Sequence, residues 1–288
     1  MMESSKIVNI AGKNYFYEIS DGKPGFMIEV VKRLAMVETS FQMLEVFQTN
    51  GYGNLMTLDG CTMVSTFENH FYHEMISHPA IFSHPNPKDV CIIGGGDCGT
   101  LKEVLKHKSI RSVIQVDIDK LVTDMSLLFF PELCSSNNDP RASLLFDDGI
   151  KWMENAPDAS MDIIIVDSTD PAGPALGLFN EKFYNNCFRV LKEDGIIVQQ
   201  SESPLIHIDL QNDIRSIMRE SGFKNITMSV FPQSIYPSGW WSVTMASKSD
   251  YVFSKDLLIN KDFETRYYNA DIHFSTQTSS VDMLNQLK

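Results

Sequence analysis

Acidic side chains dominate the segments of this sequence that could carry chemistry. The most informative segment is IIIVDSTDPAGP, in which Asp167 and Asp170 follow an apolar run and precede Pro171 and Pro174. Two carboxylates on a stiff loop can bind a cation, and one can act as a general base. Helix capping is the structural alternative, but we expect the next helix to begin near Leu178, too late for Asp170 to cap it.

A glycine-rich turn forms the second segment. The run IIGGGDCGT places Gly94, Gly96 and Gly99 in G-x-G-x-x-G spacing between an expected strand and an expected helix. Such a turn lets a ligand approach the backbone. Asp117 ends the next expected strand, close to the spacing of about 20 residues at which a carboxylate holds a ribose in nucleotide-binding folds. The pattern predicts a nucleoside ligand.

Two further acids refine the identity of that ligand. Asp97 lies inside the glycine turn, where a dinucleotide would place its pyrophosphate. A carboxylate there repels phosphate and attracts an ammonium group, which disfavours NAD and favours an adenosyl-sulfur compound. Asp147 and Asp148 end a third expected strand, and one of them is a candidate acceptor for the adenine amino group. An acidic turn is the simpler alternative for this pair.

Alternating strands and helices must position these acids. From Val90 onward, apolar strands alternate with helical stretches, which predicts a parallel sheet covered on both faces. Ligands of such sheets bind beyond the carboxyl ends of the strands, so the acids should share one edge. The chain to about residue 65 is β-rich, with an Asp59-Gly60 hairpin signal. We expect residues 67–83 to form a helix.

Composition restricts the partners. The chain has 288 residues, a net charge of −13 and a pI near 4.9. This charge argues against binding nucleic acid or an anionic membrane and fits a cationic small substrate. The five cysteines show neither C-x-x-C nor zinc spacing, so we expect reduced thiols in a cytoplasmic protein and no metal. We expect no signal peptide, and no transmembrane helix because no run of ~18 apolar residues is present.

A set of motifs adds a resemblance to a known family. YHEM, SHPNP, GGGDCGTLKEVLKH, VDID, DDG, DSTDPAGP, LKEDG, QSESPLIH and YPSGWW occur in that order over roughly residues 40–248. The sequence thereby resembles the polyamine aminopropyltransferases, the family of the spermidine synthases. The resemblance implies an α/β fold with a small N-terminal β-strand domain, residues 1–66. A methyltransferase-like, doubly wound and mostly parallel sheet would follow in residues 67–288. It also implies a homodimer or homotetramer.

The reaction implied by the resemblance is aminopropyl transfer from decarboxylated S-adenosylmethionine to putrescine. The products would be spermidine and 5′-methylthioadenosine, and the donor would be a co-substrate, with no cofactor. Two alternatives stay open: the same transfer to another amine, such as cadaverine or agmatine, and methyl transfer from intact S-adenosylmethionine.

The resemblance also assigns site residues by position, with Asp167 as the catalytic base. The donor would be bound by Gln42, Asp97, Asp117, Asp148, Gly149, Asp167 and Pro174, and the amine by Tyr72, His73, Asp167, Asp170 and Tyr236.

The match departs from the family pattern at Cys98, Asn69, Asp117 and Leu205 and at the N-terminal tryptophan. Cys98 replaces a glycine, and we expect it to be tolerated if its φ is negative. The family often has an N-terminal tryptophan against the distal end of the amine, whereas the first tryptophan here is Trp152. Tyr15 or Tyr17 is the candidate replacement, so the acceptor remains open.

Overall fold

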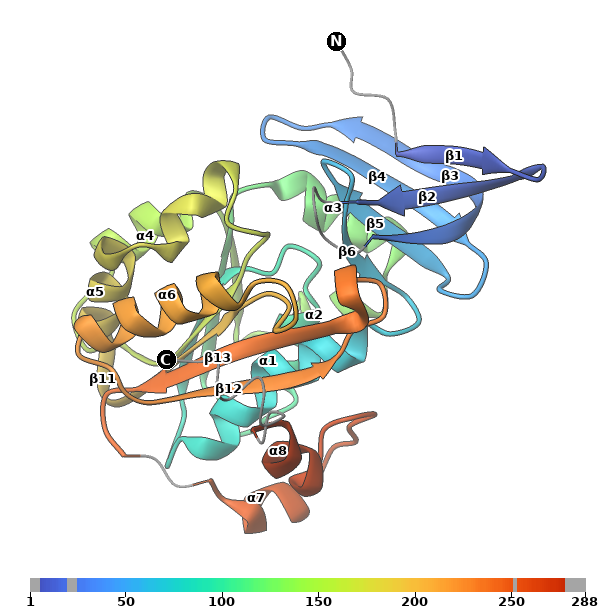
Figure 1. Cartoon of the computed structure of the whole chain (residues 1–288). Helices are drawn as coiled ribbons and strands as arrows, with labels where there is room; N and C mark the ends of the chain where they lie inside the picture. Colours follow the sequence, from blue (N-terminus) through green and yellow to red (C-terminus); the bar gives the residue numbers. More distant parts are fainter. Residues whose placement is uncertain (1–5, 20–24, 251–252, 278–288) are drawn as a thin grey trace.

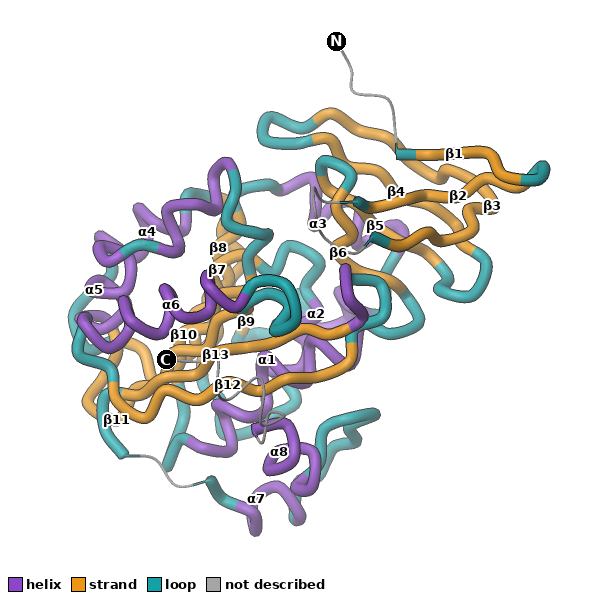
Figure 2. The backbone as a smooth tube through the Cα atoms, in the orientation of Figure 1, coloured by secondary structure: helices purple, strands orange, loops and turns teal. Residues whose placement is uncertain are grey.

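Two β-sheets make up the framework of the protein. The computed structural model describes residues 6–19, 25–250 and 253–277, so the outer ends of the predicted 1–66 and 67–288 domains lie outside the described residues. A smaller antiparallel sheet near the N-terminus lies beside a larger α/β unit, and both can be followed in Figures 1 and 2.

The N-terminal sheet is a meander in which each strand pairs with its neighbour in sequence. Its strands are β1 Ile7–Ile10, β2 Lys13–Glu18, β3 Phe26–Glu38, β4 Met43–Thr49, β5 Asn54–Leu58 and β6 Cys61–Ser65. Asp59 and Gly60 have φ angles of 49° and 73°, as a two-residue hairpin with a primed turn requires. The hairpin prediction is therefore confirmed.

The larger sheet has the strand order β12-β13-β11-β10-β7-β8-β9. Five strands are parallel, and β13 runs antiparallel to both β11 and β12. The bounds are β7 Asp89–Gly94, β8 Ser112–Asp117, β9 Ala142–Phe146, β10 Met161–Asp167, β11 Leu191–Gln200, β12 Lys224–Pro232 and β13 Trp240–Ser247. The predicted doubly wound, mostly parallel sheet with an N-terminal β-sheet is confirmed.

From β7 to β13, helices alternate with the strands as the pattern predicts, and two more helices follow β13 in the described part of the chain. The α-helices are α1 Asn69–Ser83, α2 Gly99–Leu105, α3 Lys120–Phe129, α4 Gly149–Asn155, α5 Glu181–Val190, α6 Ile208–Glu220, α7 Lys255–Ile259 and α8 Ala270–Gln277. Short 3-10 helices are η1 Leu133–Ser136, η2 Gly173–Phe179 and η3 Pro237–Gly239. The helix expected near Leu178 begins earlier, at Gly173, because Pro174 suits a first helical turn. Asp170 still precedes its N-cap, Ala172.

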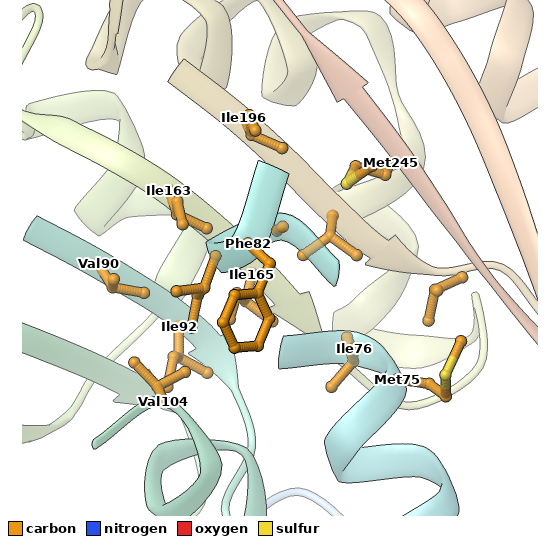
Figure 3. Close-up of a cluster of buried hydrophobic side chains, with 14 of the residues drawn as sticks. Met75, Ile76, Phe82, Val90, Ile92, Val104, Ile163, Ile165, Ile196 and Met245 are labelled. Carbon is orange, nitrogen blue, oxygen red and sulfur yellow. The ribbon is translucent and has the colours of Figure 1, made fainter. Parts of the chain in front are cut away.

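The core consists of two layers, one on each face of the larger sheet. Along β10, Ile163 and Ile165 face the layer covered by α1 and α2, whereas Ile164 and Val166 face the layer with α4, α5 and α6. Figure 3 shows the first layer, with side chains of α1 over the middle of the sheet. Burial on both faces explains why the central strands are continuously apolar.

The chain changes direction between β7 and β10. It proceeds from β7 through β8 to β9 on one side, and then returns to β10 and β11 on the other. The ends of the two central strands are aligned, since Gly94 pairs with Asp167. The N-terminal sheet packs on α3 and η1 through a separate apolar cluster that includes Val46, Val122 and Phe130. The point between β7 and β10 where the chain changes direction is the switch point of the sheet, and open α/β sheets bind their ligands at such a point.

Candidate active site

Two adjoining cavities lie at this switch point. The first has a volume of about 170 Å³, and its wall includes residues of the glycine turn, β8 and the loop after β10. The second, of about 260 Å³, lies between β6, the 168–172 loop and the segment after β11. Both cavities are lined by Met63, Tyr72, Ser168, Thr169 and Tyr236. They are therefore contiguous.

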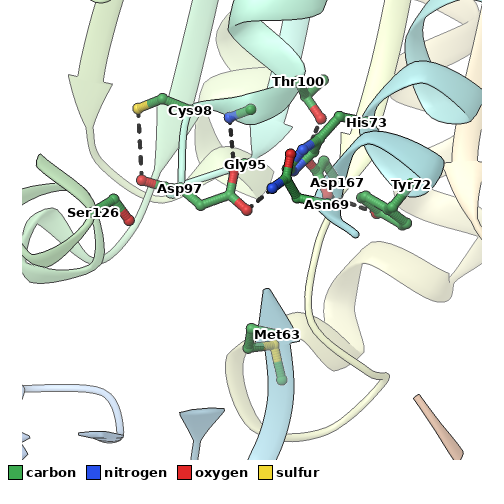
Figure 4. A network of polar contacts seen from close by, with 12 residues as sticks. Met63, Asn69, Tyr72, His73, Gly95, Asp97, Cys98, Thr100, Ser126 and Asp167 are labelled. Carbon is green, nitrogen blue, oxygen red and sulfur yellow. Dashed lines mark hydrogen bonds and ion pairs between the residues drawn. The ribbon is translucent and has the colours of Figure 1, made fainter. Parts of the chain in front are cut away.

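Asp167 lies beside Tyr72, where the two cavities meet. The Tyr72 hydroxyl donates to Oδ1 of Asp167 and the Thr100 hydroxyl donates to Oδ2, each at 2.6 Å (Figure 4). Burial raises the pKa of Asp167 above its ordinary value, and Asp97 raises it further, against the opposing effects of His73, Thr100 and Tyr72. A carboxylate with a raised pKa at a cavity wall is suited to accept a proton.

Asp97, within the glycine turn, is held by two contacts. Its Oδ2 lies 3.1 Å from Nε2 of His73, and its Oδ1 accepts from the Gly99 N–H at 2.8 Å. Burial alone would lower the pKa of His73, but Asp97 raises it above the ordinary value. The pair in turn holds the pKa of Asp97 below its usual range despite burial. His73 lines neither cavity, so its link to the site runs through Asp97.

The glycine turn contains one strained residue. Cys98 has a φ of 68°, so the condition under which it was expected to be tolerated, a negative φ, is not met. The turn between β7 and α2 imposes the left-handed conformation, and the buried thiol packs 3.6 Å from the Gly96 carbonyl oxygen. Gly99 is sterically required, because a Cβ there would overlap the His73 ring. Strained backbone of this kind costs roughly 1–3 kcal/mol and is concentrated at functional sites.

The far side of the first cavity carries the predicted ribose and adenine acids. Burial raises the pKa of Asp117 to about 7, with Asp119 and Asp167 adding to the effect. Gln42 donates to Asp119 at 3.0 Å and lines the cavity from the N-terminal sheet. Asp148 caps α4 through the Ile150 and Lys151 N–H groups and also lines the cavity. Asp148 therefore has a structural role at the start of α4 and also lies on the wall of the first cavity.

The remaining predicted residues divide between the cavities. Gly149 and Pro174 line the first cavity, Asp170 lines the second, and Tyr236 lines both. The Tyr236 hydroxyl donates to the Met63 carbonyl at 2.6 Å, which fixes the ring between the two sheets. Every predicted site residue except His73 thus lies on a cavity wall.

Two carboxylates of the second cavity were missed by the sequence analysis. Glu18 on β2 is 5% exposed and accepts from the Thr62 N–H and hydroxyl at 2.8 and 2.9 Å. Burial raises the pKa of Glu18 against these two hydrogen bonds, and nearby Asp170 adds to the rise. Glu202 follows β11 with a φ of 63° and pairs with His207 at 3.2 Å.

The expected replacement for the absent tryptophan is not found. Neither Tyr15 nor Tyr17 lines the second cavity; the adjacent Glu18 does. Side chains alternate across a strand, so Glu18 and Tyr17 point to opposite faces of β2. The sequence could have indicated Glu18 only if the face of β2 that turns toward the second cavity had been known.

Comparison with known proteins identifies the family. The model of the spermine/spermidine synthase domain matches residues 69–256, and that of the spermidine synthase tetramerisation domain matches residues 14–68. The chain belongs to the spermine/spermidine synthase family. It is an aminopropyltransferase, as the motif resemblance predicted.

Individual relatives agree with this family assignment. A polyamine aminopropyltransferase of Methylococcus capsulatus is 54% identical over 88% of this chain and 89% of its own length. One from Xanthomonas axonopodis pv. citri is 57% identical over 84% and 86%. A crystal structure of spermidine synthase in complex with the transition-state analogue AdoDATO superposes with a TM-score of 0.91 at 32% identity, covering 95% of this chain and 94% of that one. Spermidine synthase from Thermotoga maritima gives a TM-score of 0.89 at 32% identity, with the same coverage.

Three further observations concern metal binding, membrane-spanning helices and the cysteines. Within residues 6–19, 25–250 and 253–277, no cluster of three or more His, Cys, Asp or Glu side chains could hold a metal ion. No helix in the described part of the chain is long and apolar enough to span a membrane. All five cysteines are free thiols.

Proposed function

We propose that this aminopropyltransferase moves the aminopropyl group of decarboxylated S-adenosylmethionine to putrescine, giving spermidine and 5′-methylthioadenosine. The single observation that carries the proposal is the pair of contiguous acidic cavities with Asp167 and Tyr72 at their junction. Two cationic substrates would repel each other in water. Carboxylates on both sides of the junction offset that repulsion and allow the substrates to meet end to end.

The first cavity would hold the donor. Its apolar wall, which includes Ile93, Val116 and Leu178, suits an adenine ring, with Asp148 available to its amino group. Asp117 accepts hydrogen bonds from ribose hydroxyls when it is ionised. Asp97 and Asp167 would hold the ammonium end of the aminopropyl group, where intact S-adenosylmethionine would place a repelled carboxylate. Gln42, Gly149 and Pro174 complete the wall.

The second cavity would hold the acceptor amine. Glu18, Asp170 and Glu202 supply carboxylates along its length, and Tyr72 and Tyr236 flank the end that meets the donor. A diamine places one nitrogen at the junction and the other among these carboxylates. Cadaverine has the same two amino groups at a larger separation, and agmatine has an amino group at one end and a guanidinium group at the other, so the position of the acids decides among them.

The chemistry requires removal of one proton before attack. A primary ammonium has a pKa of about 10, so it reaches the site protonated and without a free lone pair. Asp167 takes that proton, and the neutral nitrogen then attacks the methylene carbon bonded to sulfur. A C–N bond forms as the C–S bond breaks, and the sulfonium becomes a neutral thioether. The positively charged sulfur is already a good leaving group, so no cofactor is needed for this step.

Assays of purified protein with an amine panel test the proposal. With decarboxylated donor, mass spectrometry should detect equal amounts of 5′-methylthioadenosine and spermidine when putrescine is the acceptor. Cadaverine, agmatine and spermidine, tested at equal concentrations, rank the alternatives by kcat/KM. Methylated product from intact S-adenosylmethionine would support the methyltransferase alternative, and absence of methylthioadenosine with every amine would refute the proposal.

The proposal extends to assembly, organisation and location. We propose a homodimer or homotetramer, supported by the match of residues 14–68 to a tetramerisation domain. We place the boundary between the N-terminal domain and the catalytic domain at residues 66 and 67. The free thiols support a cytoplasmic location, where reduced cysteines persist. The acidic charge argues against nucleic-acid and membrane partners.

A further inference from the structure

Thr100 lies directly behind the proposed base and belongs to none of the motif-assigned roles. It sits in the first turn of α2 and is completely buried. Its hydroxyl donates to Oδ2 of Asp167 at 2.6 Å, although the two residues are 67 positions apart in sequence. Figure 4 shows Thr100 and Tyr72 approaching the Asp167 carboxylate from different directions.

The two oxygens of Asp167 have unequal surroundings. Oδ2 faces the glycine turn, since a Cβ on Gly95 would lie only 3.1 Å from it, and it is also bonded to Thr100. Oδ1 is bonded to Tyr72, whose ring lines both cavities. One oxygen is thus fixed against the protein interior, and the other lies on the side where the cavities join.

We propose that Thr100 is a positioning residue that fixes Oδ2 of Asp167, so that Oδ1, shared with Tyr72, is the oxygen that takes the proton of the acceptor amine. This inference rests on the proposed function, in which Asp167 is the base. A carboxylate held at one oxygen cannot rotate freely, so its other oxygen stays aligned with the incoming nitrogen. A hydrogen bond to a charged carboxylate also stabilises the ionised form that the reaction needs.

Other charged groups act on Asp167 but do not depend on Thr100. Asp97, in the glycine turn, and Asp117, at the end of β8, repel the negative charge of Asp167. His73, on α1, attracts that charge when it is protonated. The phenols of Tyr72 and Tyr236 also face it. Replacing Thr100 with valine keeps the shape of the side chain and substitutes a methyl group for the hydroxyl, so the hydrogen bond to Asp167 is lost with little change in volume.

The test compares Thr100→Val with Thr100→Ser in the full chain, with putrescine and decarboxylated donor across pH 5.5–9.5. For Thr100→Val, kcat should fall about tenfold, and the acidic limb of the kcat profile should move up by about one pH unit. The KM for the donor should stay within twofold. Thr100→Ser keeps the hydroxyl and should restore both rate and profile. Thr100→Ala serves as a second hydroxyl-free variant if Thr100→Val does not fold.

Two outcomes would overturn the inference. One is a parental pH profile in the hydroxyl-free variant. The other is equal damage in Thr100→Ser, which would indicate packing instead of hydrogen bonding. Carbon-13 titration of the Asp167 carboxyl, assigned with Asp167→Asn, gives a readout without turnover, and its pKa should rise in Thr100→Val. If the parent protein transfers to no amine while this pKa still rises, the proposed function fails and only the anchoring of Oδ2 stands.

Discussion

The two cavities differ in where their carboxylates come from. In the first cavity, Asp97, Asp117, Asp148 and Asp167 each lie at or just after the end of one of four parallel strands, β7 to β10. In the second cavity, Glu18 comes from the N-terminal sheet, Asp170 from a loop and Glu202 from the segment after β11. The carboxylates of the first cavity thus follow from one repeated α/β rule, whereas those of the second cavity come from separate parts of the chain.

This difference corresponds to two kinds of recognition. The first cavity combines an apolar wall with carboxylates fixed by hydrogen bonds, which suits a ligand of one defined shape. The second cavity is lined by two buried carboxylates, Glu18 and Glu202, and by the partly exposed Asp170, and burial raises the pKa of Glu18. Charge spacing, more than shape, should therefore select the acceptor. Four substitutions test this contrast, in order of decreasing effect.

Asp167→Asn tests the junction that both cavities share. The amide keeps the shape but has no carboxylate to accept the proton, so kcat should fall about a thousandfold, within the usual contribution of a general base. Single-turnover measurements of methylthioadenosine release, together with calorimetric donor binding, provide the test. Asp158→Asn, at an exposed aspartate, is the matched control. Turnover within tenfold of the parent would remove Asp167 from the role of base.

Asp97→Asn tests charge recognition in the first cavity. The parent should bind decarboxylated S-adenosylmethionine far better than the intact form, because the donor ammonium meets Asp97 and the extra carboxylate is repelled. Loss of a charge-assisted hydrogen bond should reduce this preference about 10–100-fold. Calorimetric titration of both compounds measures the ratio. An unchanged ratio would show that donor selection lies elsewhere. Because Asp97 also pairs with His73, the circular dichroism of the variant must match that of the parent.

Glu18→Gln tests whether the second cavity detects a distal charge. The KM for putrescine should rise about tenfold as one charge-assisted contact is lost, while butylamine, which has one nitrogen, should show the same KM in both proteins. Steady-state kinetics of the parent and the variant with each of the two amines give the four KM values that the comparison needs. An equal rise for butylamine would mean that Glu18 supports the fold around Thr62 and does not contact the distal nitrogen.

Asp117→Asn tests how much the proposed ribose acid lowers the stability of the folded protein. The pKa of Asp117 is raised to about 7, so the folded protein holds this proton more tightly than the unfolded chain. The associated stability is present at low pH and is lost as the pH rises from about 4, the unfolded pKa, to 7. The melting temperature of the variant should exceed that of the parent by a margin that grows from pH 5 to pH 7, because the ionised carboxylate of the parent is increasingly costly in the folded state over this range. Differential scanning calorimetry at four pH values measures it. A margin independent of pH would contradict the raised pKa.

Particular residues show how far sequence reasoning reached. Asp97, Asp117 and Asp167 were predictable because the carboxyl ends of parallel strands share one edge, whatever the exact packing. The φ of Cys98 was not, because the closure of the turn onto α2 sets it. Glu18 and Thr100 were missed because their partners lie 44 and 67 residues away, and nothing in the local pattern marks those contacts.

The alternating strands and helices, the acidic edge of the sheet and the family motifs could be read from the sequence, since they depend on local periodicity and on side-chain type. Which carboxylates line each cavity, and which oxygen of Asp167 bonds to Tyr72 and which to Thr100, became known from the folded structure. The folded structure also showed that β2 contributes an acid to the second cavity. These features depend on how the N-terminal sheet packs against α3 and how α1 and α2 cover the central strands, and such long-range packing has no signature within a single segment.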